Sequence, residues 1–230
     1  MKKVMLVFGT RPEAIKMCPL VNELKKNDSI KTIVCVTGQH KEMLEQVLDV
    51  FKVVPDYDLG IMKANQTLFT ITTSILDKIQ TVFEQEKPDI VLVHGDTTTT
   101  FATALAAFYM GIKVGHVEAG LRTYNLQSPF PEEFNRQTTS IIADYHFAPT
   151  EVAKDNLLRE GRENIFVTGN TVIDALKTTV QENYDHPILE WAKDSKLIML
   201  TAHRRENLGQ PMEHMFNAVN RILNEFEDVK

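Results

Sequence analysis

Several features that define common protein classes are scarce in this 230-residue chain. It has only two cysteines, Cys18 and Cys35, both in apolar periodic segments, so we expect two reduced core thiols and no disulfide framework. An excess of positive charge is also lacking, because the net charge is -6, and this argues against nonspecific binding to nucleic acids or to anionic membranes. No apolar run approaches the length of a membrane span. The run at residues 4–8 meets Gly9 and Pro12 at once, so we expect a first strand, no signal peptide and a cytoplasmic protein.

What the chain does contain is a regular alternation of strand-like and helix-like patterns. Apolar residues make up 43% and charged residues 24%, a mix that predicts a packed core. The βαβα order predicts an α/β fold with a doubly wound parallel sheet. Strands are predicted at residues 4–8, 31–36, 89–94, 113–118, 145–147, 165–168 and 196–201, and helices after Pro12, around 43–48, and at 68–83, 99–109 and 212–226.

The same patterns divide the chain into two parts. We expect residues 1–170 to form an N-terminal Rossmann-like domain, with a hinge around residues 169–186. Residues 171–230 would then hold a hinge helix and the start of a second Rossmann-like domain. One strand and one helix cannot bury a sheet on both faces, so this second domain is expected to be incomplete.

In open α/β sheets ligands bind beyond the carboxyl ends of the strands, so the polar residues that follow each strand are the candidates for chemistry. The first strand is followed by FGTRPEAIKM, in which Arg11 and Lys16 lie near a helix start that favours anions. The alternative is a solvated helix start with Arg11 on the surface. The segment matches neither a Walker A loop nor the full G-x-G-x-x-G fingerprint.

Two acids follow later strands of the predicted sheet. Asp96 lies in HGDTTTT after the strand at 89–94, and Glu118 is the last residue of the strand at 113–118 and begins EAGLRT. Carboxylates at these places can exchange protons or bind sugar hydroxyls. The structural alternatives are a helix-capping role for Asp96 and a solvated loop acid for Glu118.

Two further segments carry charged groups. SPFPEEFNR places Glu132 and Glu133 in the first turn of a helix, where acids are favoured, and Glu132 can pair with Arg136, so this segment alone is better explained by structure than by catalysis. AHRREN places His203, Arg204 and Arg205 after the strand at 196–201.

A metal site is a further alternative. His94-x-Asp96 and His116-x-Glu118 each put two potential ligands on one side of a strand. The carboxylates suit proton transfer equally well, and no cysteine or third histidine cluster accompanies them. We therefore expect no metal.

Taken together, these segments resemble one known family. The chain is similar to the non-hydrolysing UDP-N-acetylglucosamine 2-epimerases of bacteria in seven segments of matching order and spacing: FGTRPEAIKM, VTGQHKEML, VLVHGDTTTT, VGHVEAGLRT, PFPEEFNR, FVTGNTVIDAL and TAHRREN. The resemblance implies a GT-B-like fold of two Rossmann-type domains facing a cleft, the second truncated here because the family continues beyond Lys230. It also implies a homodimer, no cofactor, and UDP-N-acetylglucosamine and UDP as ligands.

The family converts UDP-N-acetylglucosamine to UDP-N-acetylmannosamine by eliminating UDP and adding it back, and so supplies cell-envelope polysaccharides. The alternatives are a hydrolysing epimerase, a GT-B glycosyltransferase or an inactive nucleotide-sugar-binding fragment. The resemblance implies roles for individual positions: catalytic acids at Asp96, Glu118 and Glu132; substrate-binding groups at Arg11, Lys16 and His203; and a regulatory site at Gln39, Arg204 and Glu206, although Glu42 stands where regulated members often have glutamine.

Overall fold

The computed structural model describes residues 1–38, 41–63, 66–202 and 208–230. These residues divide into two compact units, Met1–Val180 and Gln181–Lys230, each with its own elements. Within the described ranges, no helix is long and apolar enough to cross a membrane.

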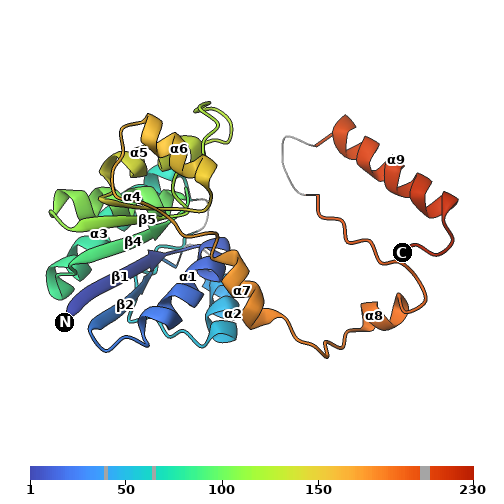
Figure 1. Cartoon of the computed structure of the whole chain (residues 1–230), viewed down its shortest axis with the longest axis horizontal. Helices are drawn as coiled ribbons and strands as arrows, with labels where there is room; N and C mark the ends of the chain where they lie inside the picture. The colour runs from blue at the N-terminus through green and yellow to red at the C-terminus, as the bar shows by residue number, and fades with distance from the viewer. Residues whose placement is uncertain (39–40, 64–65, 203–207) are drawn as a thin grey trace. The chain divides into compact units, whose positions relative to one another are not determined.

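The Met1–Val180 unit is built on one parallel sheet. Its strands are β1 (Lys2–Phe8), β2 (Ile30–Val36), β3 (Tyr57–Asp58), β4 (Ile90–His94), β5 (Lys113–Val117), β6 (Tyr145–Ala148) and β7 (Ile165–Val167). They lie in the order β3-β2-β1-β4-β5-β6-β7 (Figure 1), which confirms the predicted doubly wound α/β fold. The chain reverses its direction across the sheet between β1 and β4, and ligands of such sheets bind at the carboxyl edge of that switch point.

Helices cover both faces of this sheet (Figure 1). They are α1 (Arg11–Leu24), α2 (Lys41–Phe51), α3 (Leu68–Glu86), α4 (Thr98–Tyr109), α5 (Glu132–Ile142), α6 (Glu151–Arg159) and α7 (Val172–Thr179). Along β1, Met5 and Val7 pack in a core with α3 and α4, whereas Leu6 and Phe8 pack in a second core with α1 and α2. Both faces of β1 are therefore buried, and this explains its unbroken apolar sequence.

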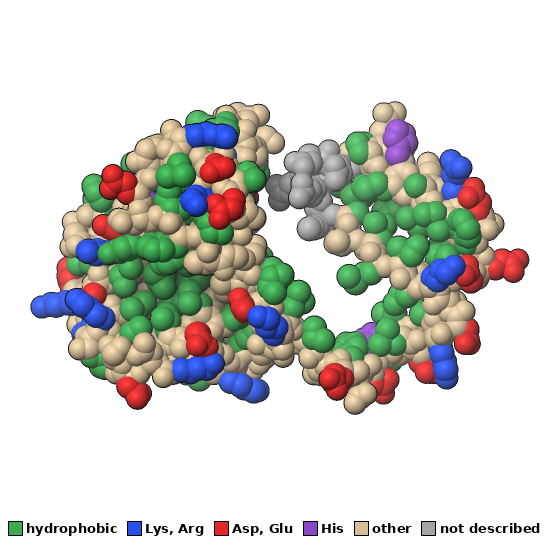
Figure 2. Space-filling view, in the orientation of Figure 1, with side chains coloured by type: hydrophobic (Ala, Val, Ile, Leu, Met, Phe, Trp, Pro, Cys, Tyr) green, Lys and Arg blue, Asp and Glu red, His purple; other side chains and the backbone are tan. Residues whose placement is uncertain are grey.

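Part of the sheet also reaches the surface. Figure 2 shows hydrophobic side chains gathered on the face turned to the viewer, where Figure 1 shows β4 and β5. At the edge strand β7, which pairs with β6, Phe166 is 50% exposed and stacks on Phe147 of β6 with ring centroids 5.9 Å apart. The two cysteines, Cys18 and Cys35, are buried and unpaired as predicted, and burial raises the pKa of each thiol to about 12.

Among its described residues, the Gln181–Lys230 unit has two helices, α8 (Pro187–Trp191) and α9 (Gln210–Glu225). The prediction of a strand at residues 196–201 is wrong in this structure: the described residues there form only an isolated bridge between Lys196 and Val229. The reason is a missing core. Ile198 is 54% exposed and Met199 is 90% exposed, so the apolar pattern of the segment has no buried face to occupy.

Candidate functional site

The carboxyl edge of the sheet brings together groups that follow β1, β4 and β5. These three strands are neighbours in the sheet, so the segments after them begin close to one another. Lys16 comes from α1, Asp96 from the turn after β4, and Glu118 from the turn after β5. Lys16 and Glu118 both act electrostatically on Asp96, so the three form one cluster at the predicted edge.

Lys16 and Glu118 form the central ion pair of this cluster. Lys16 Nζ lies 2.5 Å from Glu118 Oε2, and the side chains are only 22% and 13% exposed. Asn170 donates a second hydrogen bond from Nδ2 to the same Oε2 at 3.0 Å. Glu118 also has a left-handed backbone, with a φ of 63°, which is unfavourable for a residue with a side chain and is frequent at functional sites.

His94 lies behind this ion pair at the end of β4. Its side chain is 4% exposed, and Nε2 lies 3.7 Å from Glu118 Oε2. Burial, together with the positive charge of Lys16, lowers the pKa of His94 to about 3, so the ring is neutral near pH 7. Nε2 has no hydrogen-bond partner among the described residues, which is costly for a buried polar atom.

The ionisation of Asp96 is shifted toward neutral pH. Burial, reinforced by the negative charges of Glu118 and Glu132, raises the pKa of Asp96 to about 6, against the opposing charges of Arg136 and Lys16. Arg136 Nη1 lies 3.4 Å from Asp96 Oδ2. A carboxyl with a pKa near the working pH can both accept and return a proton, as general acid–base catalysis requires.

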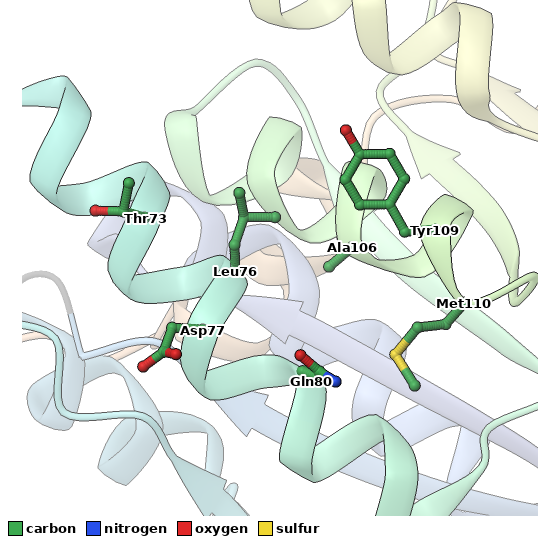
Figure 3. A pocket seen from close by; sticks show the side chains of 7 residues that line it. All are labelled: Thr73, Leu76, Asp77, Gln80, Ala106, Tyr109 and Met110. Carbon is green, nitrogen blue, oxygen red and sulfur yellow. The ribbon is translucent and has the colours of Figure 1, made fainter.

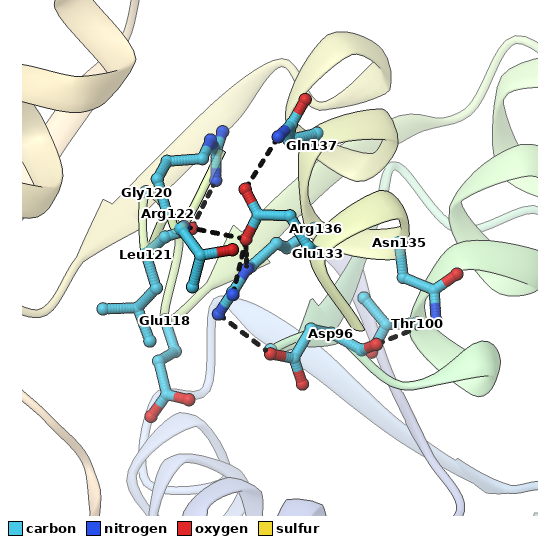
Figure 4. Close-up of polar contacts among 12 residues, drawn as sticks. Asp96, Thr100, Glu118, Gly120, Leu121, Arg122, Glu133, Asn135, Arg136 and Gln137 are labelled. Atoms are coloured by element: carbon cyan, nitrogen blue, oxygen red, sulfur yellow. Dashed lines mark hydrogen bonds and ion pairs between the residues drawn. The ribbon is translucent and has the colours of Figure 1, made fainter. Parts of the chain in front are cut away.

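The two adjacent acids of α5 lie in different surroundings. Glu132 is half-buried, whereas Glu133 is fully buried and accepts backbone N–H groups from Thr123 at 3.0 Å and Tyr124 at 2.9 Å. The expected pair of Glu132 with Arg136 is wrong. Arg136 bridges Glu133 and Asp96 instead (Figure 4), because the buried Glu133 carboxylate lies within reach three residues earlier on the helix.

Glu133 is therefore a structural acid that sequence reasoning did not separate from its neighbour. Burial opposes its ionisation, but hydrogen bonds from Gln137, Thr123, Tyr124 and Arg136 outweigh burial and lower the pKa of Glu133 to about 2. It holds the loop after β5 to the start of α5. No sequence signal distinguishes the two glutamates beyond their position in the helical turn.

A second structural acid, Glu13, holds the loop after β1. Its Oε2 accepts the backbone N–H groups of Gly9 at 3.0 Å and Thr10 at 2.8 Å, and its Oε1 accepts the Thr97 hydroxyl at 2.7 Å. Thr10 caps α1 in return, so the two form a capping box. The spacing Thr10-x-x-Glu13 is the sequence signature of that motif and could have predicted this contact.

The loop after β1 is also closely packed at Gly9. A Cβ on Gly9 would lie 1.9 Å from Thr37 Oγ1 and 2.8 Å from Thr99 Oγ1. The loop after β1 therefore approaches the segments after β2 and β4 as closely as only a glycine allows.

The remaining predicted residues are placed differently. Arg11 is exposed in the first turn of α1 and lines a groove of about 310 Å³ formed with α2 and α7, outside the contacts of the acid cluster. His203, Gln39, Arg204 and Glu206 lie outside the described residues. A second groove, between α3 and α4 (Figure 3), contains none of the candidate site residues; its lining is Thr73, Leu76, Asp77, Gln80, Ala106, Tyr109 and Met110.

The geometry gives no support to the metal alternative. His116 donates from Nε2 to the Gly95 carbonyl oxygen at 2.7 Å and is fully buried, so this nitrogen is already used. Across the described ranges, no group of three or more His, Cys, Asp or Glu side chains could hold a metal ion.

The fold and the groups at the carboxyl edge of the sheet define the class of this protein. It is a Rossmann-type α/β protein with two acids and a cation at the switch point of its sheet. The comparison with protein families then gives the identification: the model described as UDP-N-acetylglucosamine 2-epimerase matches residues 22–230, and the chain belongs to that family. The resemblance found in the sequence is confirmed.

Individual relatives agree with this assignment. The chain is 65% identical to the UDP-N-acetylglucosamine 2-epimerase of Bacillus subtilis over 99% of its own length and 60% of that protein. It is similar to the crystal structure of the Neisseria meningitidis UDP-GlcNAc 2-epimerase bound to UDP-GlcNAc, with a TM-score of 0.91, 51% identity, and coverage of 99% of this chain and 64% of that one.

A more distant relative has the same fold. The Methanocaldococcus jannaschii UDP-GlcNAc 2-epimerase, solved in complex with UDP-GlcNAc and UDP, matches with a TM-score of 0.83 at 35% identity, covering 99% of this chain and 64% of that one. The chain thus spans about three fifths of the length of the relatives that it matches.

Proposed function

We propose that this chain forms part of an enzyme that interconverts UDP-N-acetylglucosamine and UDP-N-acetylmannosamine. Membership of the family supports the reaction, and the cluster of Lys16, Asp96 and Glu118 at the switch point supports the place where it occurs. The observation that carries the proposal is the convergence of a cation and two partly buried carboxylates from three separate segments. Such a set is suited to moving a proton beside a negatively charged leaving group.

The chemistry is an elimination followed by an addition. A carboxylate takes the proton from carbon 2 while the bond from carbon 1 to UDP breaks, and the two carbons form the double bond of 2-acetamidoglucal. A proton then returns to the opposite face of carbon 2 as UDP adds back to carbon 1. Asp96, Glu118 and Glu132 supply the proton-transferring groups, and Asp96 suits this work because burial raises its pKa to about 6.

Cationic groups stabilise the departing UDP. Lys16 is the cation paired with Glu118, and Arg11 and His203 complete the proposed set. The dipole of α1, which begins at Arg11, also favours negative charge at this end of the helix. We further propose a regulatory nucleotide-sugar site that includes Gln39, Arg204 and Glu206.

The wider setting follows from the family. We propose that residues 171–230 form a hinge helix and the start of a second Rossmann-type domain, that the protein works as a cytoplasmic homodimer, and that its product feeds cell-envelope polysaccharides. UDP-N-acetylglucosamine and UDP are the proposed ligands, as the names of the solved relatives indicate for those proteins.

Product analysis tests the reaction. The protein to use is this chain extended after Lys230 by the corresponding C-terminal part of the Bacillus subtilis relative, called here the extended protein. With UDP-N-acetylglucosamine it should yield UDP-N-acetylmannosamine without free sugar. Free N-acetylmannosamine with UDP would indicate a hydrolysing epimerase, sugar transfer to an added acceptor a glycosyltransferase, and binding without turnover a nucleotide-sugar-binding protein.

A further inference from the structure

Asn170 makes two side-chain hydrogen bonds that connect the acid cluster to α7. Its Nδ2 donates to Glu118 Oε2 at 3.0 Å, and its Oδ1 accepts the backbone N–H of Val172 at 3.0 Å. The second bond fixes the orientation of the amide, because Oδ1 must face the N–H donor. The NH₂ group is thereby aimed at the carboxylate.

The contacts of Glu118 are concentrated on one oxygen. Lys16 Nζ at 2.5 Å and Asn170 Nδ2 at 3.0 Å both reach Oε2, and His94 Nε2 lies 3.7 Å from it. In the described part of the chain, no hydrogen bond reaches Oε1. That oxygen faces Gly95, where even a Cβ would lie 3.7 Å away.

This asymmetry has a chemical consequence. A carboxylate that is anchored through one oxygen presents the other in a fixed direction, and catalysis depends steeply on such alignment. Lys16 alone provides a charge on a flexible stem, which does not set the rotation of the carboxyl group. The planar amide of Asn170, itself fixed by Val172, supplies the missing directional contact.

We propose that Asn170 is a positioning residue: together with Lys16 it holds Oε2 of Glu118, so that Oε1 is the oxygen that exchanges the proton with the sugar. This assignment rests on the proposed epimerase function. It gives a role to an amide that the catalytic chemistry itself does not use.

Two substitutions separate positioning from simple stability. Asn170→Ala removes both hydrogen bonds, whereas Asn170→Asp keeps an acceptor for Val172 but replaces the donor to Glu118 by a second carboxylate. Asn22→Ala is the matched control, because Asn22 Nδ2 donates one hydrogen bond of 3.0 Å to Phe51 O and belongs to none of the site contacts. Asn170→Ala should lose more stability than Asn22→Ala, because it removes two hydrogen bonds, one of them to a charged carboxylate.

The first readout needs no turnover. In the 230-residue chain labelled with ¹³C at the glutamate side-chain carboxyl carbons, the Glu118 signal is assigned by its loss in Glu118→Gln. Loss of a donor to the charged carboxylate should move the titration midpoint of Glu118 to higher pH in Asn170→Ala, and a neighbouring carboxylate should move it further in Asn170→Asp. Asn22→Ala should leave the midpoint unchanged.

The second readout is kinetic and uses the extended protein. Asn170→Ala should lower kcat by about 10- to 100-fold with KM changed by less than about threefold, because alignment and not binding is lost. In Asn170→Asp the acidic limb of the pH–rate profile should move to higher pH. An unshifted Glu118 titration in both variants, or a kcat equal to that of Asn22→Ala, overturns the assignment. If the unsubstituted extended protein lacks epimerase activity, the proposed function fails, and the titration alone decides whether Asn170 holds Glu118.

Discussion

Lys16 and Glu118 are 102 residues apart in the sequence, and their side chains meet at 2.5 Å. The contact joins the first helix of the sheet unit to the end of β5 across the switch point, at a place where both side chains are largely shielded from water. A lysine ion pair on the protein surface contributes little to stability, whereas a shielded pair beside the buried, neutral His94 is more strongly coupled.

The coupling of this ion pair is measurable. Lys16→Met leaves the Glu118 carboxylate with Asn170 but without a counter-charge, so it should destabilise the 230-residue chain by about 1–3 kcal/mol. In a double-mutant cycle with Glu118→Gln, urea unfolding should give an interaction free energy of about 1 kcal/mol or more. Effects that add within about 0.3 kcal/mol would show that the two groups do not depend on each other.

Asp96→Asn should have opposite effects on stability and on activity. The pKa of Asp96 is raised from 3.8 to about 6 in the folded chain, so the folded state binds this proton more tightly, and stability is lost as pH rises from about 4 to about 6. At pH 7 the neutral amide should therefore stabilise the chain by about 1 kcal/mol, or roughly 2–4 °C in Tm, while turnover of the extended protein falls at least ~100-fold.

Measuring the melting temperature at two pH values checks whether Asp96→Asn raises or lowers stability. The gain in Tm from Asp96→Asn should be present at pH 7 and should shrink at pH 4, where the native aspartic acid is also neutral. A variant that is less stable than the parent at pH 7 would show that the Arg136 contact outweighs burial at this position.

Substitutions of the adjacent residues Glu132 and Glu133 should have different effects: one on activity and the other on stability. Glu133→Gln disturbs a buried carboxylate with several donors and should cost about 2–4 kcal/mol of stability. Glu132→Gln should change Tm by less than about 1 °C but lower turnover of the extended protein at least ~100-fold.

The lowered pKa of Glu133 should also make the stability of the fold sensitive to acid. Its pKa is lowered from 4.5 to about 2, so its contribution to stability is complete above pH 4.5 and is lost as pH falls toward 2. Acid titration of stability should therefore be shallower below pH 4.5 in Glu133→Gln than in the parent. Equal slopes would contradict the role of this carboxylate.

Gly9→Ala tests the close approach of the loop after β1. Its new methyl group would meet Thr37 Oγ1 at 1.9 Å, and Thr37 is fully buried, so the expected cost exceeds about 3 kcal/mol. Gly161→Ala is the control: Gly161 has a φ of +70° but open space around its Cβ position, so only the backbone term of about 1–2 kcal/mol applies. Thermal unfolding that ranks the control as the more damaging change would contradict the packing described here.

Much of the fold could be read from the sequence because buried parallel strands have an unmistakable composition. The predicted strands at residues 4–8 and 113–118 correspond to Lys2–Phe8 and Lys113–Val117, which are buried along most of their length. The patterns did not predict β3, with only two residues, or α6, which buries only Ala153 and Leu157. Such short or mostly exposed elements carry too few apolar positions to show a period.

The position of the candidate site in the fold could be predicted from the sequence, whereas most of its contacts could not. Asp96 and Glu118 follow strand ends, and that position alone marked them. The pair of Glu118 with Lys16, the amide of Asn170 and the burial of His94 depend on how distant segments meet, which no local pattern records. The strand predicted at residues 196–201 is absent for a related reason. An apolar run becomes a strand only where a neighbouring strand and a core are present.

Isotope exchange at carbon 2 of the sugar tests the central claim most directly. The extended protein is incubated with UDP-N-acetylglucosamine in D₂O, and deuterium at carbon 2 is followed by mass spectrometry and NMR. The account predicts that every molecule of epimer formed carries solvent deuterium at that carbon and that Asp96→Asn and Glu118→Gln slow its appearance at least ~100-fold. Epimer formed without deuterium, or wild-type exchange in both variants, would contradict it.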